Sequence, residues 1–186
     1  MTLLLLGILL WWAAHMVKPL APEWRASLDA RLGAGPATGA FGAVIALAVV
    51  LMVIGFRRAP YVELWSSPGW ALHVNNLLMV IAVLAFATSH SRSRARAWFR
   101  HPMLLAVTLW SVAHLLVNGD AASLLLFGSM GVWSLVEMAA INRRDGPWTP
   151  PATGTAKGDI RLVLISAVVF VVIVAVHTWL GYPPFR

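Results

Sequence analysis

The chain has 186 residues, of which 60% are hydrophobic and only 11% charged, and its mean hydropathy is +0.78. A water-soluble fold of this size would leave too much apolar surface in water, so this composition excludes an ordinary soluble domain. The absence of cysteine excludes disulfides and thiolate metal sites. The formal charge of +7 lies in short stretches between apolar runs, which is typical of membrane topology signals rather than of a nucleic-acid surface.

Six apolar runs are long enough to cross a hydrocarbon layer about 30 Å thick. Taken in chain order, they predict helices over residues 2–18, 38–56, 70–89, 102–118, 120–141 and 160–180. The runs lack the alternation of barrel strands, so the predicted fold class is all-α, a polytopic membrane bundle of about six transmembrane helices in one domain over residues 1–186. The first run has no basic leader and no small-residue cleavage site, so we expect a retained helix.

The basic residues predict the orientation of this bundle. Eleven of the fourteen lysines and arginines lie in the predicted loops 18–37, 90–101 and 142–161, against Arg57, Arg58 and Arg186 on the other side. Because basic loops stay in the cytoplasm, we expect both termini outside it. Asn118-Gly119-Asp120 predicts a tight antiparallel hairpin between two helices, and the proline-rich and glycine-rich segment 145–158 predicts a flexible cytoplasmic loop.

Histidine is the unusual feature of a chain with few other ionisable groups in its apolar runs. Polar groups inside a bilayer are costly, so each is a functional hypothesis, although a lone one is as often a helix contact. From the predicted helix directions, an inner tier holds His15 and His101, and an outer tier holds His73, His114 and His177. His90 is most simply a solvated loop residue.

Polar neighbours accompany both tiers. Ser111, His114 and Asn118 share one helix face, and such groups could orient an imidazole that binds iron, copper or zinc. In the inner tier, Arg100-His101-Pro102 opens a helix, where anions are attracted. Glu137 approaches the same side, either as a carboxylate paired with Arg100 or His101 or in a functional role. Trp11 and Trp110 each precede a histidine by one turn, and either flank a flat macrocycle or simply pack between helices.

Several strings of the sequence resemble one family. Arg100-His101-Pro102-Met103-Leu104, the run Leu109–Leu116 with its Ala113-His114-Leu115-Leu116, and Asn118-Gly119-Asp120 are similar to the NnrU family of bacterial membrane proteins. The likeness extends to His15, to Leu64-Trp65 and to His73. It implies a multi-pass protein of the bacterial inner membrane, with a supporting role in nitric oxide and denitrification-linked metabolism and nitric oxide reductase components as partners.

The NnrU family is in turn similar to the zeta-carotene isomerases, which use haem b to convert a cis double bond of a lipophilic polyene to trans. This resemblance implies iron ligation by His15 and His114, while pairs within one tier, His114 with His73 or His177 and His15 with His101, are the alternatives. The isomerase pattern has a cysteine three residues before the second ligand, where this chain has Ser111. A hydroxyl is a poor iron ligand, which weakens the isomerase reading and leaves catalytic residues unassigned.

Two other functions compete with haem binding. One is a non-enzymatic membrane factor for assembly or transport of a reductase, whose histidines only pair helices or bind a metal transiently. The other rests on a more distant similarity to membrane methyltransferases, in which the corner formed by His101 and Glu137 helps to hold S-adenosylmethionine. In all three cases we expect membrane lipid, and no nucleic acid, as a partner.

Overall fold

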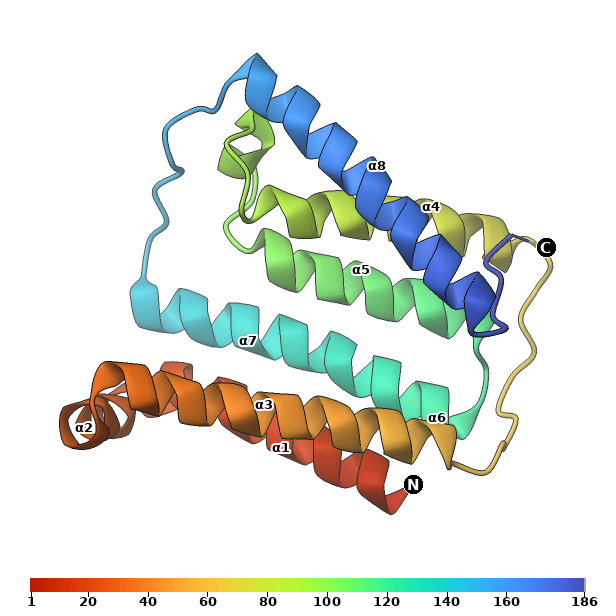
Figure 1. The fold of residues 1–186 in the computed structure, drawn as a ribbon, viewed down its shortest axis with the longest axis horizontal. Helices are drawn as coiled ribbons and strands as arrows, with labels where there is room; N and C mark the ends of the chain where they lie inside the picture. Colours follow the sequence, from red (N-terminus) through yellow and green to blue (C-terminus); the bar gives the residue numbers. More distant parts are fainter. Residues whose placement is uncertain (186) are drawn as a thin grey trace. The chain divides into compact units, whose positions relative to one another are not determined.

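The computed structural model describes residues 1–185, and their regular secondary structure is helical. An isolated antiparallel bridge joins Glu63 and Asp120. In chain order the elements are α1 (Thr2–Leu20), α2 (Pro22–Leu32), α3 (Ala34–Arg57), α4 (Ala71–Thr88), η1 (Arg94–Ala97), α5 (Pro102–Val117), α6 (Ala121–Ser123), η2 (Leu124–Gly128), α7 (Ser129–Asp145) and α8 (Ala156–Trp179). Figure 1 labels the α-helices.

Helices form at all six apolar runs, so the all-α prediction is confirmed. Five helices are both long enough and apolar enough to cross a membrane: α1, α3, α4, the continuous segment Ala121–Asp145 and α8. The sixth, α5, is apolar but has only 16 residues. The chain therefore has the character of a membrane protein, while the number of spans and their orientation stay predictions.

The helix α2 differs from the prediction of a loop over residues 18–37. Pro22 occupies its first turn together with Glu23, and Arg31 lies in its last turn, all placements that favour a helix. Arg25 and Asp29, one turn apart, form an ion pair on its surface. These capping and charge signals are visible in the sequence. The segment has no apolar run, however, so a search for membrane-spanning helices does not find it.

Contacts along the chain define two compact units. The first comprises Met1–Ser66 and Gly119–Gly146, and the second comprises Ser67–Asn118 and the chain from Pro147 onward. In the first unit α1 packs against α3 and α7, and in the second α4 packs against α5 and α8.

Glycines allow α1 and α3 of the first unit to approach closely. A Cβ atom on Gly55 would lie 2.2 Å from the Leu4 backbone nitrogen, and one on Gly7 would lie 2.7 Å from that of Met52. Leu4 is completely buried in this contact. Small residues at such crossings let helices gain van der Waals contact in the absence of a hydrophobic driving force.

Gly119 and Asp120, which start the second segment of the first unit, bond to the residues that follow α3 and cap α6. The carbonyl oxygen of Gly119 accepts hydrogen bonds from the backbone N–H groups of Leu64 (2.7 Å) and Trp65 (3.1 Å). The side chain of Asp120 caps α6 by accepting from the N–H groups of Ala122 and Ser123, both at 3.0 Å. Two of the strings that carry the family likeness, Leu64-Trp65 and Gly119-Asp120, thus meet in space.

Polar contacts hold the second unit together at both ends of its helices. Near the start of α4, the Asn75 amide donates to the Ala113 carbonyl oxygen of α5 (2.9 Å), and Asn76 donates to the Pro184 carbonyl oxygen (2.8 Å). At the opposite end, the Thr155 N–H donates to the Arg92 carbonyl oxygen (3.1 Å). The segment after Asp145 is irregular, as predicted, but its last residues are held against the loop that follows α4.

Candidate cofactor site

Two turns of helix, one in each unit, repeat the same arrangement around a tryptophan and a histidine. In α1, Nδ1 of His15 lies 2.9 Å from the Trp11 carbonyl oxygen, and in α5, Nδ1 of His114 lies 2.9 Å from that of Trp110. The rings also contact each other, with centroids 4.1 Å apart for Trp11 and His15 and 5.2 Å apart for Trp110 and His114. Both turns have the sequence Trp-x-x-Ala-His.

This anchoring determines the tautomer of a neutral imidazole. A carbonyl oxygen can only accept a hydrogen bond, so Nδ1 carries the proton and Nε2 carries the lone pair. A histidine fixed in this way presents Nε2 as a metal ligand, and the hydrogen bond at Nδ1 is the usual outer support of such ligands. The two histidines that the isomerase resemblance selects therefore share a ligand-competent form.

A third candidate, His177 in the last turn of α8, is anchored in the same manner. Its Nδ1 lies 2.8 Å from the Ile173 carbonyl oxygen. It belongs to the second unit, as does His114, and each of the two lies in the last turn of its helix. His73 is in the first turn of α4, at the same end of this unit, but its side chain is exposed. The grouping of the predicted outer tier at one end of the unit is thus consistent with the structure.

The remaining two histidines of the second unit lie at its other end. His101 is the N-cap residue of α5 and is half-buried, so a full helix separates it from His114 in the last turn. His90 is exposed in the loop after α4. The predicted separation along α5 of His101, in the inner tier, from His114, in the outer tier, therefore agrees with the bounds of that helix.

In the first unit, His15 forms part of an aromatic and charged cluster that the sequence did not reveal. Trp133 of α7 packs edge-on against the His15 ring, with centroids 4.9 Å apart, and against Trp11 at 5.2 Å. Trp133 is 3% exposed, so α1 and α7 bury this contact fully. An apolar residue on a distant helix gives no sequence signal of such a contact.

A cavity of about 360 Å³ lies beside this cluster, and its walls include His15, Glu137, Lys18, Arg25 and Arg144. Oε2 of Glu137 is buried without a hydrogen-bond partner among the described residues. Lys18, Arg25 and Arg144 thus place three basic side chains around the same cavity as this carboxylate. Glu137 and His15 are in the first unit and His101 is in the second, so pairing of Glu137 with Arg100 or His101 stays a prediction.

Ser111 lies one turn before His114 on α5. It is 1% exposed, and its Oγ has no hydrogen-bond partner among residues 1–185. A buried hydroxyl without a partner is costly, so this position has a polar atom that the protein itself does not satisfy. It is the position at which the isomerase pattern has its cysteine.

Within residues 1–185, no three histidine, aspartate or glutamate side chains gather into a group that could hold a metal ion by themselves. A haem iron needs less from the protein, since the porphyrin supplies four ligands and one or two axial side chains suffice. The donor set found here, anchored imidazoles with tryptophan rings against them, fits that requirement. His15 and His114 belong to different units, so their pairing is not tested by the structure.

Comparison with known proteins gives one result. Neither the curated proteins nor the solved structures contain a match to the chain. The family model described as NnrU protein matches residues 3–184, which is nearly the whole chain. The match includes both Trp-x-x-Ala-His turns, the Arg100-His101-Pro102 string and Asn118-Gly119-Asp120. The chain therefore belongs to the NnrU protein family.

Proposed function

We propose that this chain is a multi-pass protein of the bacterial inner membrane, with about six spans and both termini outside the cytoplasm, that binds haem b through His114 and His15. The observation that carries the proposal is the repeated turn in which a tryptophan carbonyl oxygen accepts from Nδ1 and leaves the lone pair on Nε2. His177 shares the bond from Nδ1 to the preceding turn, but among the described residues only His15 and His114 also have a tryptophan ring against the imidazole.

The arrangement of basic residues supports the proposed orientation. Lys18, Arg25 and Arg144 line one cavity of the first unit, so predicted cytoplasmic loops lie at one end there. In the second unit, the loop around Arg92 contacts the chain near Thr155, so the predicted cytoplasmic loops 90–101 and 142–161 meet there. The positive-inside rule then assigns these ends to the cytoplasm.

Bound haem would supply a redox-active or gas-binding iron, and the protein would contribute its axial ligands and the surroundings that set its potential. Trp11 and Trp110 would exclude water from the neighbourhood of the ligands. Ser111 weighs against isomerisation through exchange of a thiolate ligand, so we favour electron transfer or gas sensing in nitric oxide metabolism, with nitric oxide reductase components as partners. Isomerisation of a lipophilic polyene is the alternative use.

The test is the optical spectrum of protein purified in detergent from cells with ample haem. We expect a Soret band that His114→Ala abolishes and that His15→Ala weakens or shifts, since losing one of two axial ligands changes the iron's coordination. His90→Ala, which changes an exposed loop histidine, is the matched control and keeps the wild-type spectrum.

Other outcomes would change the assignment. If His177→Ala alters the band and His15→Ala does not, the second ligand lies within the second unit. If the wild-type protein is colourless and the three variants unfold at wild-type temperatures, haem binding is wrong. A colourless protein that co-purifies with reductase subunits would support an assembly factor, and binding of S-adenosylmethionine that depends on His101 and Glu137 would support a methyltransferase.

A further inference from the structure

The second unit contains a much larger hollow than the cavity beside His15. It has a volume of about 1250 Å³ and runs between α4, the loop Ser91–Arg96, the segment that precedes α8, and α8 itself. None of the histidines proposed as haem ligands lines it. The groove, as we call this hollow, is therefore separate from the candidate cofactor site.

One half of the groove is apolar. From α8, Ile165, Val169 and Ile173 line it at intervals of four residues, which places them on one face of the helix. Opposite them, Val83 and Phe86 of α4 line the other wall. An apolar channel between two candidate membrane-spanning helices matches the shape and chemistry of an acyl chain.

The other half of the groove is cationic. Its lining includes Arg92 and Arg96 from the loop after α4, and Lys157 and Arg161 from the first turns of α8. The side chains of Arg92, Lys157 and Arg161 are exposed. No carboxylate is among the described lining residues, so these four positive charges are not offset within the groove.

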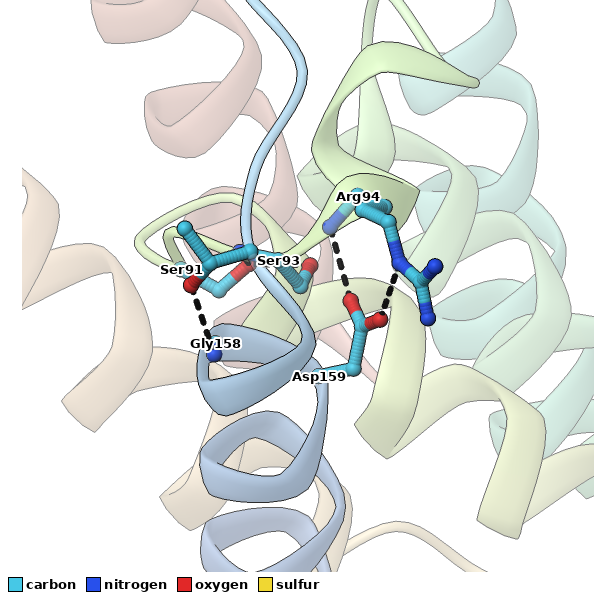
Figure 2. Close-up of polar contacts among 6 residues, drawn as sticks. Ser91, Ser93, Arg94, Gly158 and Asp159 are labelled. Atoms are coloured by element: carbon cyan, nitrogen blue, oxygen red, sulfur yellow. Dashed lines mark hydrogen bonds and ion pairs between the residues drawn. The ribbon is translucent and has the colours of Figure 1, made fainter.

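The acidic residue nearest in sequence, Asp159, is already engaged. Its two carboxylate oxygens accept from the backbone N–H of Arg94 (2.7 Å) and from Nε of the same residue (2.6 Å), as Figure 2 shows. This pair ties the loop to the first turn of α8 and leaves the four basic side chains of the groove without that carboxylate as a partner. The carboxylate of Asp159 therefore holds the loop after α4 against α8 and is not a partner for the basic side chains of the groove.

Close backbone contacts join the loop after α4 to the segment that leads into α8. A Cβ atom on Gly158 would lie 2.1 Å from the Arg92 carbonyl oxygen, and one on Gly154 would lie 2.2 Å from the Ser93 carbonyl carbon. Ser93 is 1% exposed, and its Oγ lies 2.7 Å from that of Ser91. The cationic side chains thus extend from two segments whose backbones pack directly against each other.

We propose that the groove binds an anionic phospholipid, with its phosphate among Arg92, Arg96, Lys157 and Arg161 and an acyl chain between α4 and α8. Charge complementarity selects this occupant, because a neutral polyene would gain nothing from four uncompensated cations. Basic pockets between membrane helices on the cytoplasmic side are known to suit anionic headgroups. Both loops that supply the cations are predicted to be cytoplasmic, where such lipids are abundant.

The experiment is native mass spectrometry of the detergent-purified protein with added cardiolipin, phosphatidylglycerol, phosphatidylcholine or inorganic phosphate. We expect adducts with the two anionic lipids and few with phosphatidylcholine. The double variant Lys157→Gln/Arg161→Gln should bind cardiolipin at least about tenfold more weakly, since each basic residue contributes to headgroup attraction. The control Arg57→Gln/Arg58→Gln removes the same charge at the end of α3 and should bind as the wild type does.

A second variant tests the apolar half. Val169→Trp fills the channel without changing charge, so we expect it to weaken cardiolipin binding while the unfolding temperature stays near that of the wild type. Equal binding of phosphatidylcholine, or unchanged binding by both groove variants, would overturn the proposal. Binding of inorganic phosphate as strong as that of cardiolipin would assign a phosphate site rather than a lipid site. Each readout is independent of haem.

Discussion

Replacing Gly119 by alanine tests whether the contact between the Asn118-Gly119-Asp120 string and Leu64-Trp65 stabilises the fold. The added Cβ atom would lie 1.8 Å from the Trp65 carbonyl oxygen and 2.8 Å from the Trp65 carbonyl carbon. Neither atom can move alone, because both belong to the backbone. The two segments must therefore separate by more than an ångström to restore an ordinary contact.

That separation has a cost that can be worked out. It stretches the hydrogen bonds from Leu64 and Trp65 to the Gly119 carbonyl oxygen, at 2.7 and 3.1 Å, and the bond from Ala121 to the Val62 carbonyl oxygen at 2.9 Å. Each net hydrogen bond contributes about 1 kcal/mol, so their loss lowers the free energy of unfolding by about 3 kcal/mol. For a chain of this size, that corresponds to a fall in Tm of roughly 6–12 °C.

Thermal unfolding followed by tryptophan fluorescence in detergent measures this change, since the chain has ten tryptophans. The matched control is Gly42→Ala on α3, where nothing lies within 4 Å of the added atom. Alanine there should hold or raise the Tm, because it favours helix over glycine by about 1 kcal/mol. If both variants unfold at the same temperature, the reasoning about this contact is refuted.

Three further changes have expected outcomes in the same assay. Gly55→Ala should lower the Tm by several degrees, because its Cβ atom would lie 2.2 Å from the Leu4 backbone nitrogen and overpacking costs about 1–3 kcal/mol. An unchanged Tm would contradict the close crossing of α1 and α3. Ser111→Ala should give a haem-free protein whose Tm equals or exceeds that of the haem-free wild type, because the buried Ser111 hydroxyl has no hydrogen-bond partner among the described residues. A clear fall in Tm would show that the hydroxyl does have a partner. Asp159→Asn should change the Tm little, because Arg94 is 62% exposed and solvent screens the ion pair. It should nevertheless speed proteolysis of the loop after α4, and unchanged proteolysis would show that the pair does not hold the loop.

The apolar helices could be predicted from sequence because hydropathy is a local property of the chain. The observed bounds of α4, Ala71–Thr88, differ by one residue at each end from the predicted range 70–89. By contrast α8 begins at Ala156, before the predicted start at 160, because Thr155 caps it by accepting from the Gly158 N–H at 3.0 Å. Polar capping turns extend a helix beyond its apolar run, and a hydropathy criterion misses them.

The candidate site was predictable only in part. Histidines stand out in an apolar sequence, so the ligand candidates come from sequence alone, and their ligation of iron stays a prediction. The contact of Trp133 with His15 was not found, because it depends on how α1 and α7 pack rather than on spacing within either helix. The same holds for the groove between α4 and α8, whose basic residues were interpreted only as topology signals.

The anchored imidazoles permit a sharper distinction between a ligand and a helix contact than alanine substitutions do. Glutamine in place of His114 keeps a polar side chain of similar length that can hydrogen-bond but is a poor iron ligand. If His114 only joins helices, His114→Gln should retain most of the stability and leave any absorption unchanged. If it binds haem, the variant should lose the Soret band and the stabilisation that bound haem gives, while its haem-free Tm matches that of the haem-free wild type. The comparison of the two haem-free proteins separates loss of a ligand from damage to α5.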